Sequence, residues 1–189
     1  SISVSTDNRV AYVPFWHDTF LFSVDVASGE VRQVNSNSKD NFGARFAPDG
    51  RAVAYHSTRT GNSEIWVCYL DGRPETQITD HENWDLYPDW SPDGERMIFV
   101  SDRDGSLFKI FIANSDGGGA RLLVEQPITL DSQYSPVIGS LVSRWSPDGK
   151  RIAYLAEGKE ALALWTVGAD GSGAKKALEN ATGFDWYLD

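Results

Sequence analysis

The residues of this chain that could do chemistry are its histidines and its clustered carboxylates. His17, His56 and His81 fall near the ends of expected strands or in connecting segments, where imidazoles could bind a metal or transfer protons. Their spacing is not that of a ligand set. Asp102 and Asp104 alternate as in a calcium loop, yet the further acidic ligands of an EF-type loop do not follow them. The sequence therefore predicts no cofactor and no metal site, and calcium or another divalent metal is the alternative.

Nucleophilic catalysis is not indicated either. The chain has no Gly-x-Ser-x-Gly motif, which positions the nucleophile of many serine hydrolases. The glycine-rich runs at 117–119 and 171–173 lack both the spacing of a phosphate-binding loop and a following helix, so we interpret them as hairpin turns. Cys68, the single cysteine, lies in an apolar run and is expected to be buried. We therefore expect a binding protein and not an enzyme.

One phrase recurs along the chain and indicates its organisation. It reads Phe46-Ala-Pro-Asp-Gly50, then Trp90-Ser-Pro-Asp-Gly94, then Trp145-Ser-Pro-Asp-Gly149, and each copy is followed by an apolar run that contains arginine. A degraded copy at residues 5–12 lacks the aromatic residue and the proline. Self-similarity of this kind predicts an array of repeated structural units.

Each repeat contains four short runs rich in β-branched and aromatic residues, separated by turn residues such as Asp71-Gly72. Proline and glycine interrupt every longer stretch, so no helix is expected. The pattern predicts an all-β fold, a β-propeller of four-stranded antiparallel blades with about four blades present. We expect blade 1 at about residues 1–40, blade 2 at 41–82, blade 3 at 83–126, an insertion at 126–142, blade 4 at 143–180, and the start of a further strand at 181–189.

At these residues the sequence resembles the TolB-like, WD-repeat-like propellers, which also occur as propeller domains of prolyl-oligopeptidase-type peptidases. Trp-Ser-Pro-Asp-Gly and Ser101-Asp-Arg-Asp-Gly105 carry the resemblance, which covers nearly the whole chain. It implies blades that run from a central axis outward, with the Pro-Asp-Gly turns on one face. The loops between second and third strands then share the opposite face, the loop face, with the connectors between blades. The resemblance also favours a periplasmic or extracellular location.

Loop-face residues that depart from the repeat are the candidates for binding a partner. Trp16 and Trp84 have no counterpart in the other repeats, and Tyr134 belongs to the insertion. The acidic residues of this face favour a basic or cationic partner. We therefore predict a protein or peptide partner bound by Trp16, His17, His81, Trp84, Asp85, Asp102, Asp104, Asp131 and Tyr134.

Two other functions stay open at this point. The chain could be a gating propeller that selects substrates for a larger serine peptidase, which a longer gene encoding a hydrolase would support. It could also be a metal-assisted polysaccharide lyase that uses the loop-face histidines, which bound divalent metal and uronate turnover would support. Fold alone does not decide among these functions.

The charge and length of the chain narrow the partners further. It has 17 basic and 27 acidic residues and a net charge of -10, which opposes binding to nucleic acid. No apolar stretch reaches the roughly 20 residues that cross a bilayer, so no membrane span is expected. Propellers of the resembled family usually have six to eight blades. We therefore expect either a piece of a longer propeller or a short form that closes alone or as a homodimer through open blade edges.

Overall fold

The computed structural model describes residues 2–5, 9–12, 20–36, 39–105, 107–128, 142–158, 161–181 and 184. Within them, sixteen β-strands form four four-stranded antiparallel sheets, each built from strands that are consecutive in the chain. The strands are β1 (Ile2–Val4), β2 (Arg9–Tyr12), β3 (Phe22–Asp25) and β4 (Val31–Gln33) in blade 1; β5 (Asn41–Phe46), β6 (Ala52–Ser57), β7 (Glu64–Tyr69) and β8 (Thr76–Gln77) in blade 2; β9 (Asp85–Trp90), β10 (Arg96–Ser101), β11 (Lys109–Asn114) and β12 (Arg121–Val124) in blade 3; and β13 (Ser143–Trp145), β14 (Arg151–Glu157), β15 (Leu162–Gly168) and β16 (Lys175–Leu178) in blade 4. These described residues include no helix, and hence no helix that could cross a membrane.

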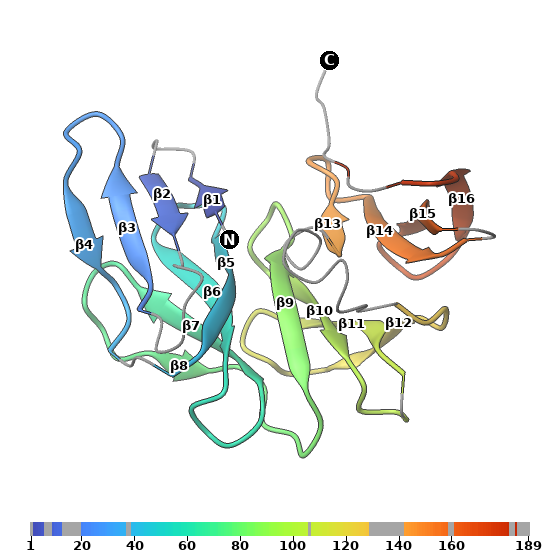
Figure 1. The fold of residues 1–189 in the computed structure, drawn as a ribbon, viewed down its shortest axis with the longest axis horizontal. Coiled ribbons are helices and arrows are strands. Elements are labelled where there is room, and N and C mark those ends of the chain that lie inside the picture. The colour runs from blue at the N-terminus through green and yellow to red at the C-terminus, as the bar shows by residue number, and fades with distance from the viewer. Residues whose placement is uncertain are drawn as a thin grey trace.

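The first strands of the blades are neighbours in space, as a propeller requires. β1 contacts β5, β5 contacts β9, and β9 contacts β13, so these four strands are the inner ones. Figure 1 shows the blades following one another in chain order, from blade 1 in blue to blade 4 in orange and red. The expected fold, a β-propeller with about four antiparallel four-stranded blades, is confirmed.

The recurring Pro-Asp-Gly phrase forms the turn between the first and second strands of blades 2, 3 and 4. Asp49, Asp93 and Asp148 each accept the backbone N–H of the residue two positions later, at 2.9, 3.0 and 3.0 Å. Ser91 and Ser146 add a hydroxyl oxygen that accepts the N–H five residues later, at 2.9 Å in both turns. The phrase recurs because these side chains satisfy the backbone of the turn.

The hairpin between the third and fourth strands of blade 3 contacts the preceding blade closely, unlike the hairpin of blade 2. In blade 3, Gly117 has a φ of +88°, and a Cβ on it would lie 2.0 Å from the carbonyl oxygen of Ile78 in blade 2. In blade 2, Gly72 has a φ of +82°, but a Cβ there would meet nothing within 4 Å. Only the first of these hairpins therefore presses its backbone against a neighbouring blade.

The hydrophobic core lies between neighbouring blades, where the face of one sheet packs against the face of the next. One cluster joins blades 2 and 3 around Met97, and another joins blades 3 and 4 around Tyr154. The repeated aromatics predicted to be core residues are buried or packed against these clusters, as predicted. They are Phe46, Trp66, Trp90, Phe111, Trp145 and Trp165. Cys68 is fully buried, also as predicted.

Candidate partner-binding site

Five of the residues predicted for partner binding come together where blade 2 meets blade 3. They are His81, Trp84, Asp85, Asp102 and Asp104. His81 and Trp84 lie in the connector between β8 and β9, and Asp85 is the first residue of β9. Asp102 and Asp104 lie in the loop between β10 and β11. We call residues 78–84, with the neighbouring loops 58–63 and 102–105, the connector site. The other four predicted residues, Trp16, His17, Asp131 and Tyr134, lie outside the described residues and stay predictions.

A buried carboxylate fixes the backbone of the connector. Glu64, at the start of β7, is 1% exposed. Its Oε1 accepts the backbone N–H of His81 at 2.9 Å, and its Oε2 accepts the hydroxyl of Thr79 at 2.5 Å. Asn62 Nδ2 donates to Glu64 and, at 2.6 and 2.8 Å, to the carbonyl oxygens of His81 and Asn83. The connector is therefore held by side chains of the adjacent loop before it reaches Trp84.

Sequence reasoning missed Glu64 and Asn62. Burial raises the pKa of the Glu64 carboxyl, and the hydrogen bonds from Thr79 and His81 act in the opposite direction. A carboxylate that is buried and accepts several hydrogen bonds positions its donors. The only signal was a charged residue at the start of an otherwise apolar strand, which by itself indicates neither burial nor partners.

Trp84 is presented to solvent on this fixed backbone. Its side chain is 51% exposed, and its backbone N–H donates to Asp102 Oδ1 at 2.9 Å. One residue earlier, the N–H of Asn83 donates to His81 Nδ1 at 3.1 Å. Leu107, in the same loop as Asp102, is 55% exposed. A large apolar side chain on an ordered backbone loses little conformational freedom when a partner covers it.

Asp85 has a different place from the other predicted site residues, because it is fully buried. Its Oδ2 lies 2.5 Å from the Arg103 guanidinium, and its backbone N–H donates to the carbonyl oxygen of Ser63 at 2.8 Å. The guanidinium also lies over the rings of Phe99 and Phe111, 5.0 and 5.3 Å from their centroids. A buried carboxylate cannot touch a partner directly, so Asp85 supports the loop that carries Asp102.

Arg59 holds the matching position in blade 2 and makes matching contacts with a different acid. Its guanidinium lies 4.0 Å from the centroid of the Trp66 ring, hydrogen-bonds to the Tyr55 hydroxyl and forms an ion pair with Glu75. Both arginines thus tie a loop to an aromatic pair of their own blade. This confirms the interpretation, from their equivalent positions in the repeat, that Arg59 and Arg103 are structural.

A second aromatic group lies beside the connector site, at the start of the inner strands. Phe42 on β5 is 38% exposed, and its ring centroid lies 5.7 Å from that of His56. The His56 ring meets Tyr87 edge-on at 4.8 Å, and its Nδ1 accepts the Tyr87 backbone N–H at 3.2 Å. The pairing of β5 with β6 and that of β9 with β10 both shift register here, which brings these residues of different repeats together. Sequence reasoning missed the group for that reason.

Burial, helped by the charge of Arg45, lowers the pKa of His56 to about 3. The folded state therefore needs the neutral imidazole, whereas the unfolded chain protonates it near pH 6.5. The stabilisation is complete above pH 6.5 and is lost as the pH falls toward 3. Between pH 7 and pH 5 we expect the wild-type free energy of unfolding to fall by about 2 kcal/mol more than that of His56→Gln. Urea unfolding at a series of pH values checks this, and parallel pH profiles for the two proteins would contradict it.

The inner strands of three blades carry a row of alternating charges. Asp89 on β9 lies between Arg45 on β5, at 3.8 Å, and Arg144 on β13, at 3.4 Å. Its Oδ2 also accepts the backbone N–H of Trp145 at 2.9 Å. Burial raises the pKa of Asp89, and Arg144 and Arg45 oppose that effect. The row ties blades 2, 3 and 4 together at the inner strands.

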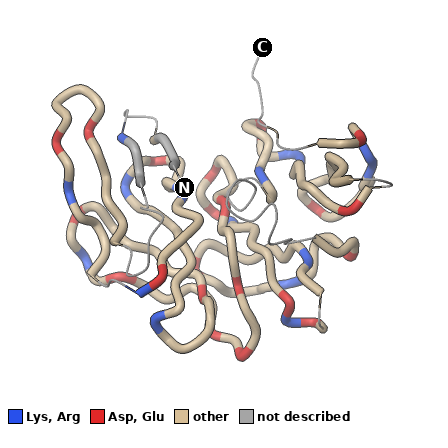
Figure 2. The backbone as a smooth tube through the Cα atoms, in the orientation of Figure 1, with Lys and Arg blue, Asp and Glu red and all other residues tan. Residues whose placement is uncertain are grey.

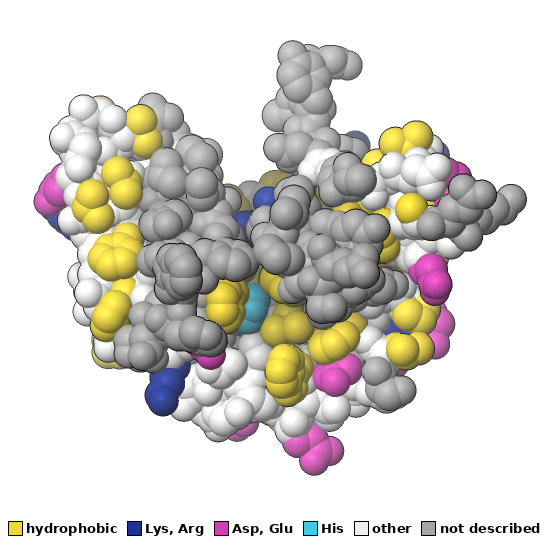
Figure 3. Space-filling view, in the orientation of Figure 1, with side chains coloured by type: hydrophobic (Ala, Val, Ile, Leu, Met, Phe, Trp, Pro, Cys, Tyr) yellow, Lys and Arg dark blue, Asp and Glu magenta, His cyan; other side chains and the backbone are white. Residues whose placement is uncertain are grey.

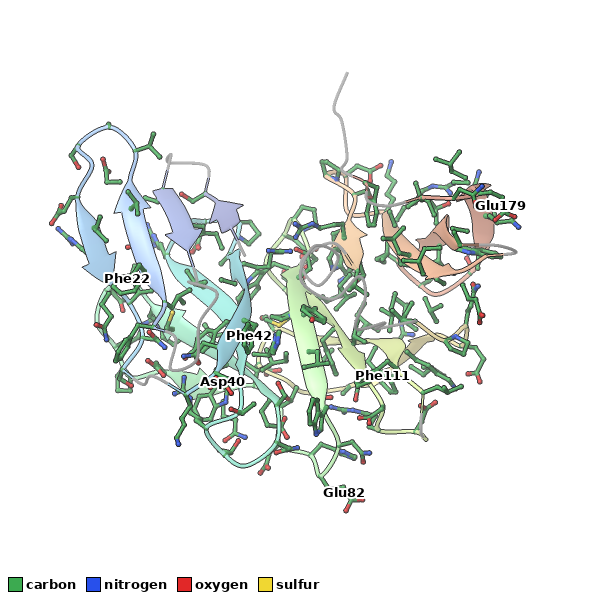
Figure 4. All side chains as sticks on the ribbon, in the orientation of Figure 1. Phe22, Asp40, Phe42, Glu82, Phe111 and Glu179 are labelled. Carbon is green, nitrogen blue, oxygen red and sulfur yellow. The ribbon has the colours of Figure 1, made fainter. Side chains whose placement is uncertain are left out.

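The connector site is acidic as well as apolar. Its two described cations, Arg59 and Arg103, are already paired with Glu75 and Asp85. Its remaining carboxylates are Asp80, Glu82, Asp102 and Asp104, of which only the last has an ion pair, with Lys109 at 3.0 Å. Figure 2 shows acidic positions along the lower edge of the backbone, and in Figure 3 acidic side chains lie beside hydrophobic ones on the lower part of this face. Figure 4 shows Glu82 at the tip of the connector, pointing away from the sheets.

The residues that the structure describes include no set of side chains that could bind a metal ion. Nowhere in that part of the chain do three His, Cys, Asp or Glu side chains gather so that they could hold an ion. His56 is buried among aromatic rings, and His81 uses Nδ1 within its own connector. His17 lies outside the described residues, so the alternative of a histidine metal site stays a prediction.

The fold and the site together define a β-propeller that presents a loop-built surface. The model of the TolB β-propeller domain family matches residues 1–176, so the chain belongs to this family. The resemblance seen in the repeat phrases is thereby confirmed.

Individual relatives agree with this assignment. An uncharacterised protein of Agrobacterium fabrum is 31% identical over an alignment of 143 residues, which covers 71% of this chain and 46% of that protein. The Tol-Pal system protein TolB of Anaeromyxobacter dehalogenans is 33% identical over 107 residues, 57% of this chain and 24% of that protein. The crystal structure of TolB from Acinetobacter baumannii superposes with a TM-score of 0.80 at 21% identity, covering 95% of this chain and 43% of that one. The chain thus spans less than half the length of each of these proteins.

Proposed function

We propose that this chain is a non-catalytic propeller module that binds a protein or peptide through the connector site. The observation that carries the proposal is Trp84, which is 51% exposed on a backbone held by buried Glu64 and by Asp102. Tryptophan is enriched among the residues that dominate protein interfaces. An exposed tryptophan on an ordered backbone therefore supports a surface that a partner covers.

Other features support a protein or peptide partner. Leu107 is exposed in the loop whose Asp102 binds the Trp84 backbone, and the connector and this loop carry carboxylates, so the site combines apolar and acidic side chains as an interface does. The proposed function uses no cofactor. A periplasmic or extracellular location, favoured by the family, belongs to the proposal, and the homodimer through open blade edges stays a prediction.

The proposal predicts that Trp84→Ala strongly weakens binding without unfolding the protein. A random peptide display library is selected on the wild-type chain, and the enriched peptides are then tested on the variant. We expect binding to weaken by about 30-fold or more, as for an interface residue worth about 2 kcal/mol. Stability should change little, because the Trp84 side chain is half exposed.

Val26→Ala is the matched control, since Val26 is also an exposed apolar residue, 58% exposed, and lies in the hairpin of blade 1. It should bind every selected peptide as the wild type does. If the library yields only peptides that bind Trp84→Ala equally well, the connector site is not the binding surface.

A further inference from the structure

Most of the described tryptophans have a cation of the chain over the ring, but the core residue Trp90 and the exposed Trp84 do not. Arg59 lies 4.0 Å from the Trp66 centroid, Arg96 lies 4.8 Å from Trp145, and Lys176 lies 5.8 Å from Trp165. No described lysine or arginine lies over Trp84. Its ring face is therefore open to a cation from outside, which would be attracted by the π electrons of the indole.

Carboxylates lie on the connector that carries Trp84 and on the loop that binds its backbone. Asp102 accepts the Trp84 backbone N–H through Oδ1 and is partly exposed. Asp104 lies in the same loop, after β10. Asp80 and Glu82 are exposed on the connector itself. Because Arg59 and Arg103 are already paired with Glu75 and with buried Asp85, the site has an excess of negative charge.

From this arrangement we infer the chemistry of the partner: the connector site binds an arginine side chain, with its guanidinium flat against the Trp84 indole and its N–H groups donating to Asp102. This inference rests on the proposed function and specifies it. A guanidinium is planar and weakly hydrated, so it stacks on an aromatic face while it hydrogen-bonds to a carboxylate at its edge. An ammonium group cannot stack in this way. The chain already uses the combination internally, where Arg103 lies over two rings and pairs with Asp85.

The test uses three small probes that differ only at the end of the side chain: N-acetyl-arginine amide, N-acetyl-lysine amide and N-acetyl-citrulline amide. Citrulline keeps the shape of arginine without its charge. Each probe is titrated into the full chain, and the indole N–H signals of the tryptophans are followed by NMR, with the Trp84 signal assigned from its loss in Trp84→Phe.

We expect arginine amide to shift the Trp84 signal and to bind at least about tenfold more tightly than citrulline amide and several-fold more tightly than lysine amide. The signals of Trp66 and Trp145 should not move, because a cation of the chain already covers each ring. Asp102→Asn should weaken arginine binding by about fivefold while an amide oxygen still accepts the Trp84 N–H. Asp71→Asn, an exposed carboxylate in the hairpin of blade 2, is the matched control and should have no effect.

The outcomes separate this inference from the function on which it rests. Equal binding of arginine and citrulline amides, equal binding of lysine amide, or no shift of the Trp84 signal would each overturn the arginine assignment. Library peptides that lack arginine but still require Trp84 would also overturn it, while leaving the proposed function intact. A library without any Trp84-dependent peptide would instead remove the proposed function itself.

Discussion

Arg103→Ala is expected to lower the free energy of unfolding by about 3–5 kcal/mol, because it leaves a buried carboxylate without its counter-charge. Asp85 is fully buried, and the guanidinium of Arg103 at 2.5 Å is its ion-pair partner. The same substitution removes the packing of the guanidinium on Phe99 and Phe111. Urea unfolding of the variant and the wild type, compared at one pH, measures the difference.

Arg73→Ala is the matched control for this experiment. Arg73 also lies over an aromatic ring, Tyr69 at 4.0 Å, and pairs with Asp71 at 3.0 Å, but both charged side chains are more than half exposed. Exposed pairs contribute about 0–1 kcal/mol, so a small loss is expected here. The double variant Asp85→Asn/Arg103→Met should lose less than Arg103→Ala alone, since no buried charge is left unpaired. Equal losses in Arg103→Ala and Arg73→Ala would show that burial of Asp85 does not matter.

The second large effect is expected from Gly117→Ala, at about 3 kcal/mol of lost stability. The left-handed φ of +88° disfavours any residue with a Cβ, and the new methyl group would lie 2.0 Å from the carbonyl oxygen of Ile78. The hairpin of blade 3 would then have to move away from blade 2.

Gly72→Ala separates the two causes. It has nearly the same φ, +82°, but no atom within 4 Å of the added Cβ, so only the conformational penalty of about 1 kcal/mol remains. Thermal unfolding of both variants gives the comparison. If the two midpoints fall by the same amount, the contact between blades 2 and 3 at Gly117 does not contribute to stability.

The architecture could be predicted because its determinants are local and repeated. The Pro-Asp-Gly turns depend on a serine or aspartate that bonds to backbone within five residues, and such contacts occur in every copy. The repeated aromatics mark the faces between blades for the same reason. The register shift in the first strand of blade 2, between Phe42 and Arg45, has no such repeated local signal.

The candidate site could be predicted only in outline. Trp84 was found because it breaks the repeat, and the structure leaves it exposed as a partner-binding residue should be. Asp85 has the same charge as Asp102 in the sequence, yet it is buried because Arg103, eighteen residues later, turns back onto it. Glu64 depends on Thr79 and His81 in the connector. Contacts between different loops follow no short motif, so neighbouring acids that look equivalent in the sequence differ in their roles.

The inner-strand contacts also bear on the order in which the blades can form. The indole N–H of Trp90 in blade 3 donates to the carbonyl oxygen of Arg45 in blade 2, at 3.3 Å, and the backbone N–H of Trp145 in blade 4 donates to Asp89 in blade 3. In both cases the acceptor is made first when the chain is synthesised from its N-terminus. At these two contacts, blades 3 and 4 therefore each meet a neighbour whose acceptor group is already in place, so these blades can add to the array one at a time.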